Sequence, residues 1–424
     1  MPLTQISTGG VKDDAITKAK IPANQIEASE LADNAVDTNA IADNAVSSAK
    51  IPTDAITQAK INIPLSNRNL VINGAMQVAQ RGTSTSNISS TGYYAVDRMR
   101  LACFVGAERY TVTQETDAPT GSGFTKSFKI KTSTADTTPN TGTFAQFSYG
   151  IEGQDLQHLC KGTSSAKTIN ISFWVKGNTN YTPVAELKET TNVRINVQTF
   201  NVTTSWTKVI LSYVADTAGG AIDNDNTVGM QFNIWLKASN YYSAGTSPTQ
   251  NTWAAQTNQN IRAALLTFDI AASTDNYFQI TGLQIEVGNP TGVVTEFEHR
   301  SFGQELALCQ RYFQEYSHAT YRGAGGFCGR KSGSSTVVGT IHGFPPMRAG
   351  ATGSVDNLAG FKLFRYSDGS TTTPTNIAIS HEGSKEPFTD VKFTCTVSSF
   401  ASTGNMCGMF TSNTSGKFTL DAEL

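Results

Sequence analysis

The sequence has few charged residues and no excess of either sign. Charged side chains make up only 16% of its 424 residues, and 32 basic residues stand against 34 acidic ones. This balance gives no field strong enough to attract nucleic acid or an acidic membrane surface. We therefore expect no nucleic-acid partner, and we expect recognition by shape and hydrogen bonds.

The sequence also lacks the signatures of metal clusters, export and catalysis. Its six cysteines form no C-x-x-C pair, and no histidine lies close enough for a zinc knuckle. The start, MPLTQISTGG, is no export signal, and no run of 18 apolar residues appears. We expect a protein that is made in the cytoplasm and does not insert into membranes.

No serine-hydrolase, zinc-protease, P-loop or Cys-His signature is present. Cleavage of a polysaccharide would need two carboxylates across a cleft, and the nearest candidates are Glu152 with Asp155 and Glu286 with Glu298. Glu286 alternates with apolar neighbours on a predicted strand, so it needs no catalytic role there. The sequence predicts a protein that is not an enzyme.

Thr, Ser, Asn and Gly are abundant, whereas Lys, Glu and Leu are scarce, which favours short strands and turns. The length allows two or three domains. We predict a mainly all-β chain with four parts: an intertwined trimeric shaft, a jelly-roll-like β-sandwich, a short helical neck and a small C-terminal β domain. Strands are predicted at 128–131, 144–149, 169–175, 193–200, 208–213, 230–236, 278–287, 335–342, 361–366, 377–380 and 391–400.

The N-terminal part repeats with a period of five. An α-helix would spread such side chains around its axis, and a flat strand would send them to alternating faces. Three copies wound about one axis would instead stack the aliphatic residues in a central column. The residues that occupy every fifth position are Val11, Ile16, Ile21, Ile26, Leu31, Val36, Ile41, Val46, Ile51, Ile56 and Ile61.

We predict a homotrimeric shaft over 11–64, preceded by an attachment segment at 1–10. A monomeric pentapeptide-type β-helix is the alternative, although the position two before each aliphatic residue is often Asn or Asp, which is too polar for a dry interior. The run AVDTNAIADNAVSSAKIPTDAITQAKI resembles shaft segments of bacteriophage tail-fibre proteins. The resemblance implies that residues 1–10 attach to other virion proteins.

Residues 65–300 are predicted to form the β-sandwich. The opening NLVINGAMQVAQRGTS and the closing ITGLQIEVGNPTGVVTEFEHRSFGQELALCQRYFQ resemble the ends of a domain found in phage tail-fibre and virion structural proteins. Between them, ISFWVKGN is similar to strands of carbohydrate-binding jelly rolls. The resemblance implies a virion location and a host-surface polysaccharide as partner.

Three aromatic residues in a loop-like stretch, Tyr241, Tyr242 and Trp253, are candidates for glycan binding. Sugar rings stack on aromatic faces, and neighbouring Asn and Gln can bond the hydroxyls. The alternative is that the three pack beneath a long loop. Trp174 and Trp235 alternate with apolar residues, which predicts core positions for both.

The loop around Asp223 and Asp225 offers alternating oxygen ligands of the kind that hold calcium. It has no glycine and no distal glutamate at a defined spacing, so an ordinary Asx-turn loop is the alternative. We expect no other cofactor.

Residues 302–316 are predicted to form a helix within a neck at 301–320. Phe302, Leu306, Cys309 and Phe313 would share one face, which could meet two symmetry mates or dock on the sandwich. The C-terminal domain, 321–424, would then be the fibre tip. By analogy with other fibres, its candidate contact residues are Tyr321, Phe327, Phe344 and Tyr366.

Three functions agree with these features. The first is a tail fibre that adheres to a host-surface glycan, where three weak sites on one rod would gain avidity. The second is a head fibre or decoration protein with a purely structural role. The third is a fibre that cleaves glycans.

Overall fold

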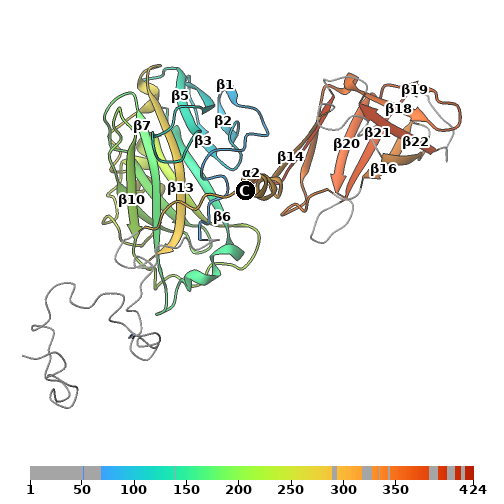
Figure 1. Cartoon of the computed structure of the whole chain (residues 1–424). Coiled ribbons are helices and arrows are strands. Elements are labelled where there is room, and N and C mark those ends of the chain that lie inside the picture. Colours follow the sequence, from blue (N-terminus) through green and yellow to red (C-terminus); the bar gives the residue numbers. More distant parts are fainter. Residues whose placement is uncertain are drawn as a thin grey trace, which may run out of the picture. The chain divides into compact units, whose positions relative to one another are not determined.

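The computed structural model describes Ile51 and residues 68–138, 140–288, 294–317, 327–333, 335–341, 344–381, 390–398, 406–411 and 416–424. The chain divides into two units, Met1–Ile63 and Pro64–Leu424. The predicted shaft and its aliphatic column lie outside the described residues, apart from Ile51. The second unit is mainly β, as predicted (Figure 1).

Two antiparallel sheets form the sandwich. The six-stranded sheet has the order β1 (Ser84–Ile88), β4 (Arg109–Glu115), β5 (Ser127–Thr134), β13 (Tyr277–Gly288), β7 (Thr168–Gly177) and β10 (Thr207–Tyr213). The seven-stranded sheet has the order β12 (Ala254–Ala255), β9 (Arg194–Thr199), β8 (Val184–Glu189), β11 (Val228–Ala238), β6 (Phe144–Glu152), β3 (Arg100–Phe104) and β2 (Ser90–Tyr93).

The main core lies between these sheets because alternate side chains of each strand point inward. On β7, Ile171 and Phe173 are fully buried in it, whereas Trp174 points to the outer face and is half-buried. Trp235 is fully buried, but it belongs to a second apolar cluster. The predicted core position is therefore wrong for Trp174, and Trp235 is buried on the other side of its sheet.

This second cluster lies on the outer face of the seven-stranded sheet. Val184, Val197 and Trp235 from the strands meet Ala263 and Leu265 from the segment between β11 and β13. That segment contains the one-turn helix α1 (Asn240–Ser243), the short strand β12 and the 3-10 turns Gln259–Ile261 and Ile270–Ala272. It covers one end of the sheet face and leaves the rest to polar residues.

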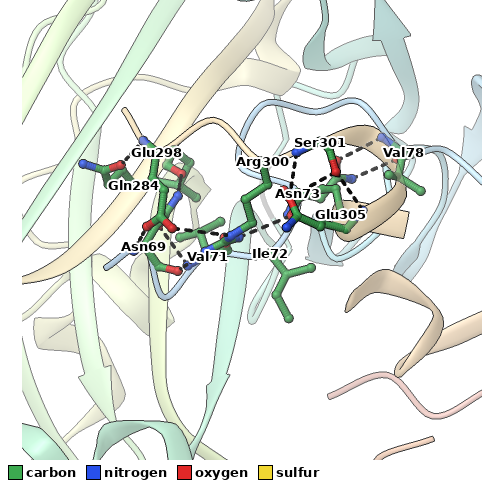
Figure 2. Close-up of polar contacts among 12 residues, drawn as sticks. Asn69, Val71, Ile72, Asn73, Val78, Gln284, Glu298, Arg300, Ser301 and Glu305 are labelled. Carbon is green, nitrogen blue, oxygen red and sulfur yellow. Dashed lines mark hydrogen bonds and ion pairs between the residues drawn. The ribbon is translucent and has the colours of Figure 1, made fainter. Parts of the chain in front are cut away.

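A hydrogen-bonded clasp joins the first described residues of this unit to the segment that follows β13 (Figure 2). One carboxylate oxygen of Glu298 accepts bonds from the backbone N–H groups of Arg68 and Asn69, at 2.7 and 2.8 Å. The Arg300 guanidinium donates to the carbonyls of Asn69 and Val71, at 2.6 and 3.0 Å. The two stretches that carry the virion-protein resemblance therefore meet in space, more than 200 residues apart in the chain.

The clasp continues into helix α2, Phe302–Gln310, whose N-terminus is capped by Ser301. The Glu305 carboxylate accepts a bond from the backbone N–H of Asn73, and the Asn73 side chain is bonded at both its oxygen and its nitrogen to the backbone of Val78. Only Glu305 and Cys309 of this helix are buried.

The predicted helix over 302–316 is too long, because Phe313–Ser317 forms strand β14. Phe313 is therefore buried on a strand, while Phe302 is 58% exposed and Leu306 is half-buried. Four residues predicted to share one helical face do not do so. A contact of Phe302 with another copy of the chain stays a prediction.

The C-terminal domain contains two more antiparallel sheets. The three-stranded sheet has the order β14, β23 (Lys417–Asp421) and β17 (Thr352–Asp356). The seven-stranded sheet has the order β19 (Thr371–Thr372), β18 (Phe361–Arg365), β22 (Met406–Thr411), β15 (Phe327–Lys331), β16 (Thr336–Ile341), β21 (Val391–Thr396) and β20 (Asn376–His381). Because β14 pairs with β23, part of the predicted neck belongs to this domain.

Of the candidate tip residues, Phe344 packs in the core of this domain against Tyr316 and Phe418. Tyr366 is 54% exposed beside Phe364. Tyr321 and the side chain of Phe327 lie outside the described residues.

Candidate functional site

A polar row crosses the outer face of the seven-stranded sheet. Strand pairing places Arg100 of β3 opposite Ser148 of β6, Ser148 opposite Asn233 of β11, and Asn233 opposite Glu186 of β8. Directly opposed residues project from the same face. The next row holds Gln146 opposite Trp235. These side chains lie on the face because their neighbours, such as Phe147 and Phe232, fill the core.

Two amide oxygens of this face have no hydrogen-bond partner among the described residues. They are the side-chain oxygens of Gln146 and Asn233, and both residues are at least 93% buried. A buried amide oxygen without a partner is costly, so it is expected to be satisfied by water or by a ligand. We call Gln146, Ser148, Gln231 and Asn233 the amide face.

A buried ion pair fixes one border of the amide face. The Arg262 guanidinium donates two bonds of 2.7 Å to the two oxygens of Glu186. Asn233 and Trp235 also donate to Glu186, at 2.9 and 3.3 Å. Burial disfavours the charged form of Arg262, but the charge and hydrogen bonds of Glu186 outweigh it and raise the Arg262 pKa. Both carboxylate oxygens of Glu186 thus accept hydrogen bonds from neighbouring side chains.

Aromatic rings form the same border. Arg262 lies over the Trp235 ring at 4.9 Å, and Tyr242 packs against Trp235 and Phe144 with ring centroids 5.2 and 5.1 Å apart. Tyr241 meets Tyr242 edge to face and is 50% exposed. The predicted pair of tyrosines therefore lies together, with Tyr242 as a packing residue and Tyr241 open to solvent.

Trp253, the third candidate, lies elsewhere. Its indole N–H donates to the carbonyl of Val214 at 2.7 Å, and the ring packs half-buried against the main core. Tyr242 packs on the second apolar cluster instead. The structure therefore does not bring Trp253 together with the two tyrosines.

In the predicted calcium loop, the Asp225 carboxylate is hydrogen-bonded within the loop. One carboxylate oxygen of Asp225 accepts from the backbone N–H and the hydroxyl of Thr227, at 2.9 and 2.7 Å, which lowers the Asp225 pKa. The described part of the chain holds no group of three or more His, Cys, Asp or Glu residues placed for a metal. Asp223 and Asp225 as calcium ligands thus receive no support.

Three of the four carboxylates considered for hydrolysis, Glu152, Glu286 and Glu298, accept structural hydrogen bonds. Glu152 is fully buried and accepts bonds from Arg311 and Tyr312, at 2.8 and 2.6 Å. Burial, and then the nearby Glu152 charge, raise the pKa of Asp155.

In the second pair, Glu286 accepts bonds from the backbone N–H and the hydroxyl of Thr295, and Glu298 forms the clasp. These hydrogen bonds account for the positions of Glu286 and Glu298.

Sequence reasoning missed the amide face and the pair of Glu186 with Arg262. The alternation of Gln146 and Ser148 with Ala145, Phe147 and Tyr149 was a usable signal for one strand. Nothing in the sequence indicates that β6 and β11 are neighbours, however. The partner of Glu186 lies 76 residues away, on an irregular segment.

The central part of the chain is thus an antiparallel β-sandwich with a polar outer face bordered by aromatic rings. No protein-family model matches the sequence, and no curated protein matches it. No described helix has the length and apolar character needed to cross a membrane.

Several solved structures are similar to it at low identity. The enzymatically active domain of tailspike protein 4 from bacteriophage CBA120 matches with 14% identity and a TM-score of 0.26, over 52% of this chain and 21% of that one. A CBM4 structure matches with 14% identity and a TM-score of 0.26, over 51% and 98% of the two chains. A family 11 carbohydrate-binding module from Clostridium thermocellum, solved with a β-1,3-1,4-mixed-linked tetrasaccharide, matches with 11% identity and a TM-score of 0.24, over 49% and 96%. Similarity this low leaves the function to be argued from the residues of this chain.

Proposed function

We propose that the chain is a non-enzymatic, homotrimeric fibre protein of a bacteriophage particle, and that its sandwich adheres to a host-surface glycan through the amide face. The observation that carries the glycan proposal is the pair of buried amide oxygens, on Gln146 and Asn233, without partners. Sugar hydroxyls donate hydrogen bonds to such oxygens. The virion location rests on the period-five repeat and on the two stretches that resemble virion proteins.

The surroundings of the amide face suit a neutral sugar. Glu186 and Arg262 neutralise each other, so the polar groups of the face are the buried amides and the buried Ser148 hydroxyl, and the half-exposed Tyr241 ring lies beyond the border. An aromatic ring beside amides provides both the stacking surface and the hydrogen bonds that a pyranose needs. The fixed ion pair keeps Asn233 and Trp235 in place before a ligand arrives.

Binding can be tested with the full-length protein on immobilised neutral glucan, galactan and mannan oligosaccharides. Gln146→Ala removes an unpartnered oxygen and no hydrogen bond within the described residues, so it should weaken binding about tenfold, and thermal unfolding of the same variant measures what the lost packing costs. Thr111→Ala, on the outer face of the other sheet, is the matched control. Equal binding by wild type and Gln146→Ala would remove the amide face as the site.

The fibre proposal is tested by mass in solution. Light scattering of the full chain should give three times 45.3 kDa, about 136 kDa, and a chain starting at Asn67 should lose the trimer or much of its thermal stability. A full-length monomer would contradict the intertwined shaft and favour a pentapeptide-type solenoid.

Two alternatives have their own readouts. A head fibre or decoration protein would be trimeric but would bind no glycan at the amide face. A depolymerase would release new reducing ends from a host polysaccharide, whereas our proposal predicts none.

A further inference from the structure

The outer face of the six-stranded sheet carries lysines and tryptophans where the other sheet carries amides. On β5, β7 and β10 these residues alternate with core residues such as Ile130, Phe173 and Val209, so they point outward. The whole-chain charge of −2 conceals this local arrangement. We call the following set the lysine–tryptophan face: Lys129, Lys131, Trp174, Lys176, Trp206 and Lys208.

The strand register brings this set together. Gln279 of β13 lies opposite Lys129 of β5 on one side and opposite Lys176 of β7 on the other. Trp174, two residues before Lys176, lies opposite Lys208 of β10. The residues therefore occupy adjacent rows across neighbouring strands, within reach of a single extended ligand.

Asp117 orients part of this face. Its two carboxylate oxygens accept one bond from the Lys176 ammonium at 2.8 Å and one from the Trp206 indole N–H at 3.1 Å. The backbone carbonyl of Asp117 accepts from the buried Gln279 side chain at 3.2 Å, which fixes the loop itself. Trp206 is thus held half-buried through its indole N–H, and it is absent from the main core.

The face keeps a positive charge. Glu115 lies 3.5 Å from Lys129, and Asp117 pairs with Lys176. Lys131 and Lys208 are exposed, and neither has a carboxylate partner in the described part of the chain. Lys129 also lies 4.6 Å from the centre of the Tyr277 ring. Two of the cations therefore remain for a partner of opposite charge.

We propose that the lysine–tryptophan face is a second glycan site, and that its ligand is an acidic polysaccharide bearing carboxylate or phosphate groups. Exposed ammonium groups pair with such anions, and indole rings stack on the C–H surfaces of the sugars between them. A two-fold contact with a second copy of this chain fits less well, because the positive face would then meet itself and be repelled. This site goes beyond the amide face, which lies on the other sheet and suits neutral sugars.

The test uses the full-length protein at low ionic strength with three polymers: polygalacturonate, poly(glycerol phosphate) and neutral dextran. We expect binding to at least one acidic polymer, which weakens as salt is added, and no binding to dextran at this face. The acidic polymer that binds more tightly identifies carboxylate or phosphate as the recognised group. Binding to neither acidic polymer would overturn the proposal.

Three variants and a control locate the site. Lys131→Gln with Lys208→Gln removes two exposed charges that hold no structural contact and should weaken acidic-polymer binding about tenfold. Trp206→Ala should weaken it by a similar factor, whereas Trp206→Phe, which keeps a ring, should restore part of the binding. The charge-matched control is Lys167→Gln with Lys362→Gln, for which we expect a change of less than about twofold.

Equal losses in the lysine pair and in its control would indicate non-specific attraction and overturn the proposal. So would a fall in solution mass in the lysine pair, because the face would then be a contact between copies. Gln146→Ala should leave acidic-polymer binding unchanged, so failure of the amide face and failure of this site give different results.

Discussion

The two outer faces of the sandwich differ in how far their ion pairs are exposed to water. On the seven-stranded sheet, Glu186 and Arg262 are buried and bonded to each other, and a long segment covers their end of the face. On the six-stranded sheet, Lys176 and Asp117 also pair, but the Asp117 side chain is 46% exposed. The ion pair of the first face is closed to water, and that of the second is open to water and salt.

The difference has a physical consequence. Removing one partner of a buried ion pair strongly lowers the free energy of unfolding, because the other charge stays buried without a partner or water. An exposed pair loses little when it is broken, since water replaces the partner. Loss of one partner of the closed Glu186–Arg262 pair should therefore lower stability strongly, whereas loss of one partner of the open Lys176–Asp117 pair should lower it little.

The largest effect should follow Glu186→Ala. It leaves the Arg262 guanidinium, 92% buried, without its carboxylate, so we expect a loss of about 3–5 kcal/mol in the free energy of unfolding of the sandwich. Urea unfolding followed by tryptophan fluorescence measures it. Asp117→Ala is the comparison on the open face and should cost less than about 1 kcal/mol.

A second change can separate charge from packing. Adding Arg262→Met to Glu186→Ala removes the stranded cation and should recover part of the loss. If the double variant is as unstable as the single one, the main contribution of Arg262 is its packing over Trp235.

An intermediate effect on stability should distinguish Tyr242 from its neighbour Tyr241. Tyr242 packs on Trp235 and Phe144, so Tyr242→Ala should cost about 2 kcal/mol of stability. Tyr241 is half exposed, and Tyr241→Ala should cost less than about 0.5 kcal/mol while weakening neutral-glycan binding. Thermal unfolding and glycan binding should be measured on both variants. An equal loss of stability in the two variants would contradict the prediction.

A smaller effect should appear with pH at a buried carboxyl outside both faces. Burial raises the pKa of Asp97 to about 6 from its usual 3.8, against the opposing hydrogen bonds from Gln80 and the charge of Arg81. Because the folded state holds this proton more tightly than the unfolded state, the contribution of Asp97 to stability rises as the pH falls through 6 and is complete below 3.8.

Between pH 7 and pH 5, the wild type should therefore gain about 1 kcal/mol relative to Asp97→Asn. Urea midpoints measured for both proteins across this range provide the test. Parallel curves would show that the carboxyl does not titrate there. Asp117→Asn is the contrast, since hydrogen bonds from Lys176 and Trp206 outweigh its modest burial and lower the Asp117 pKa, so no such gain is expected.

The long strands were predictable from sequence because the signal lies within each strand. In β7 and β11, apolar residues alternate with others over a full strand, so the period of two is legible. Short edge strands such as β12 have too few residues to show a period. The end of α2 depended on a distant segment: Phe313 continues the helical pattern, but it pairs with Asp421 more than 100 residues later.

The candidate site was predictable only in part. Tyr241 and Tyr242 are adjacent in sequence, so their proximity was certain. The separate position of Trp253 follows from its bond to Val214 and its packing on the main core, which no spacing reveals. The partnership of Glu186 with Arg262, and that of Asp117 with Trp206, join residues 76 and 89 positions apart, and only the folded register brings them together.

The smallest effect should come from the open face itself. Lys131 and Lys208 have no carboxylate partner in the described residues and are surrounded by water, so replacing both with Gln removes charge without removing a contact. We expect the free energy of unfolding to change by no more than about 0.5 kcal/mol, with any gain largest at low salt, where repulsion from Lys129 and Lys176 is least screened. Urea unfolding at two salt concentrations measures this. A loss comparable to that of Glu186→Ala would mean that the lysines hold the sheet together, and the contrast between a closed and an open face would then fail.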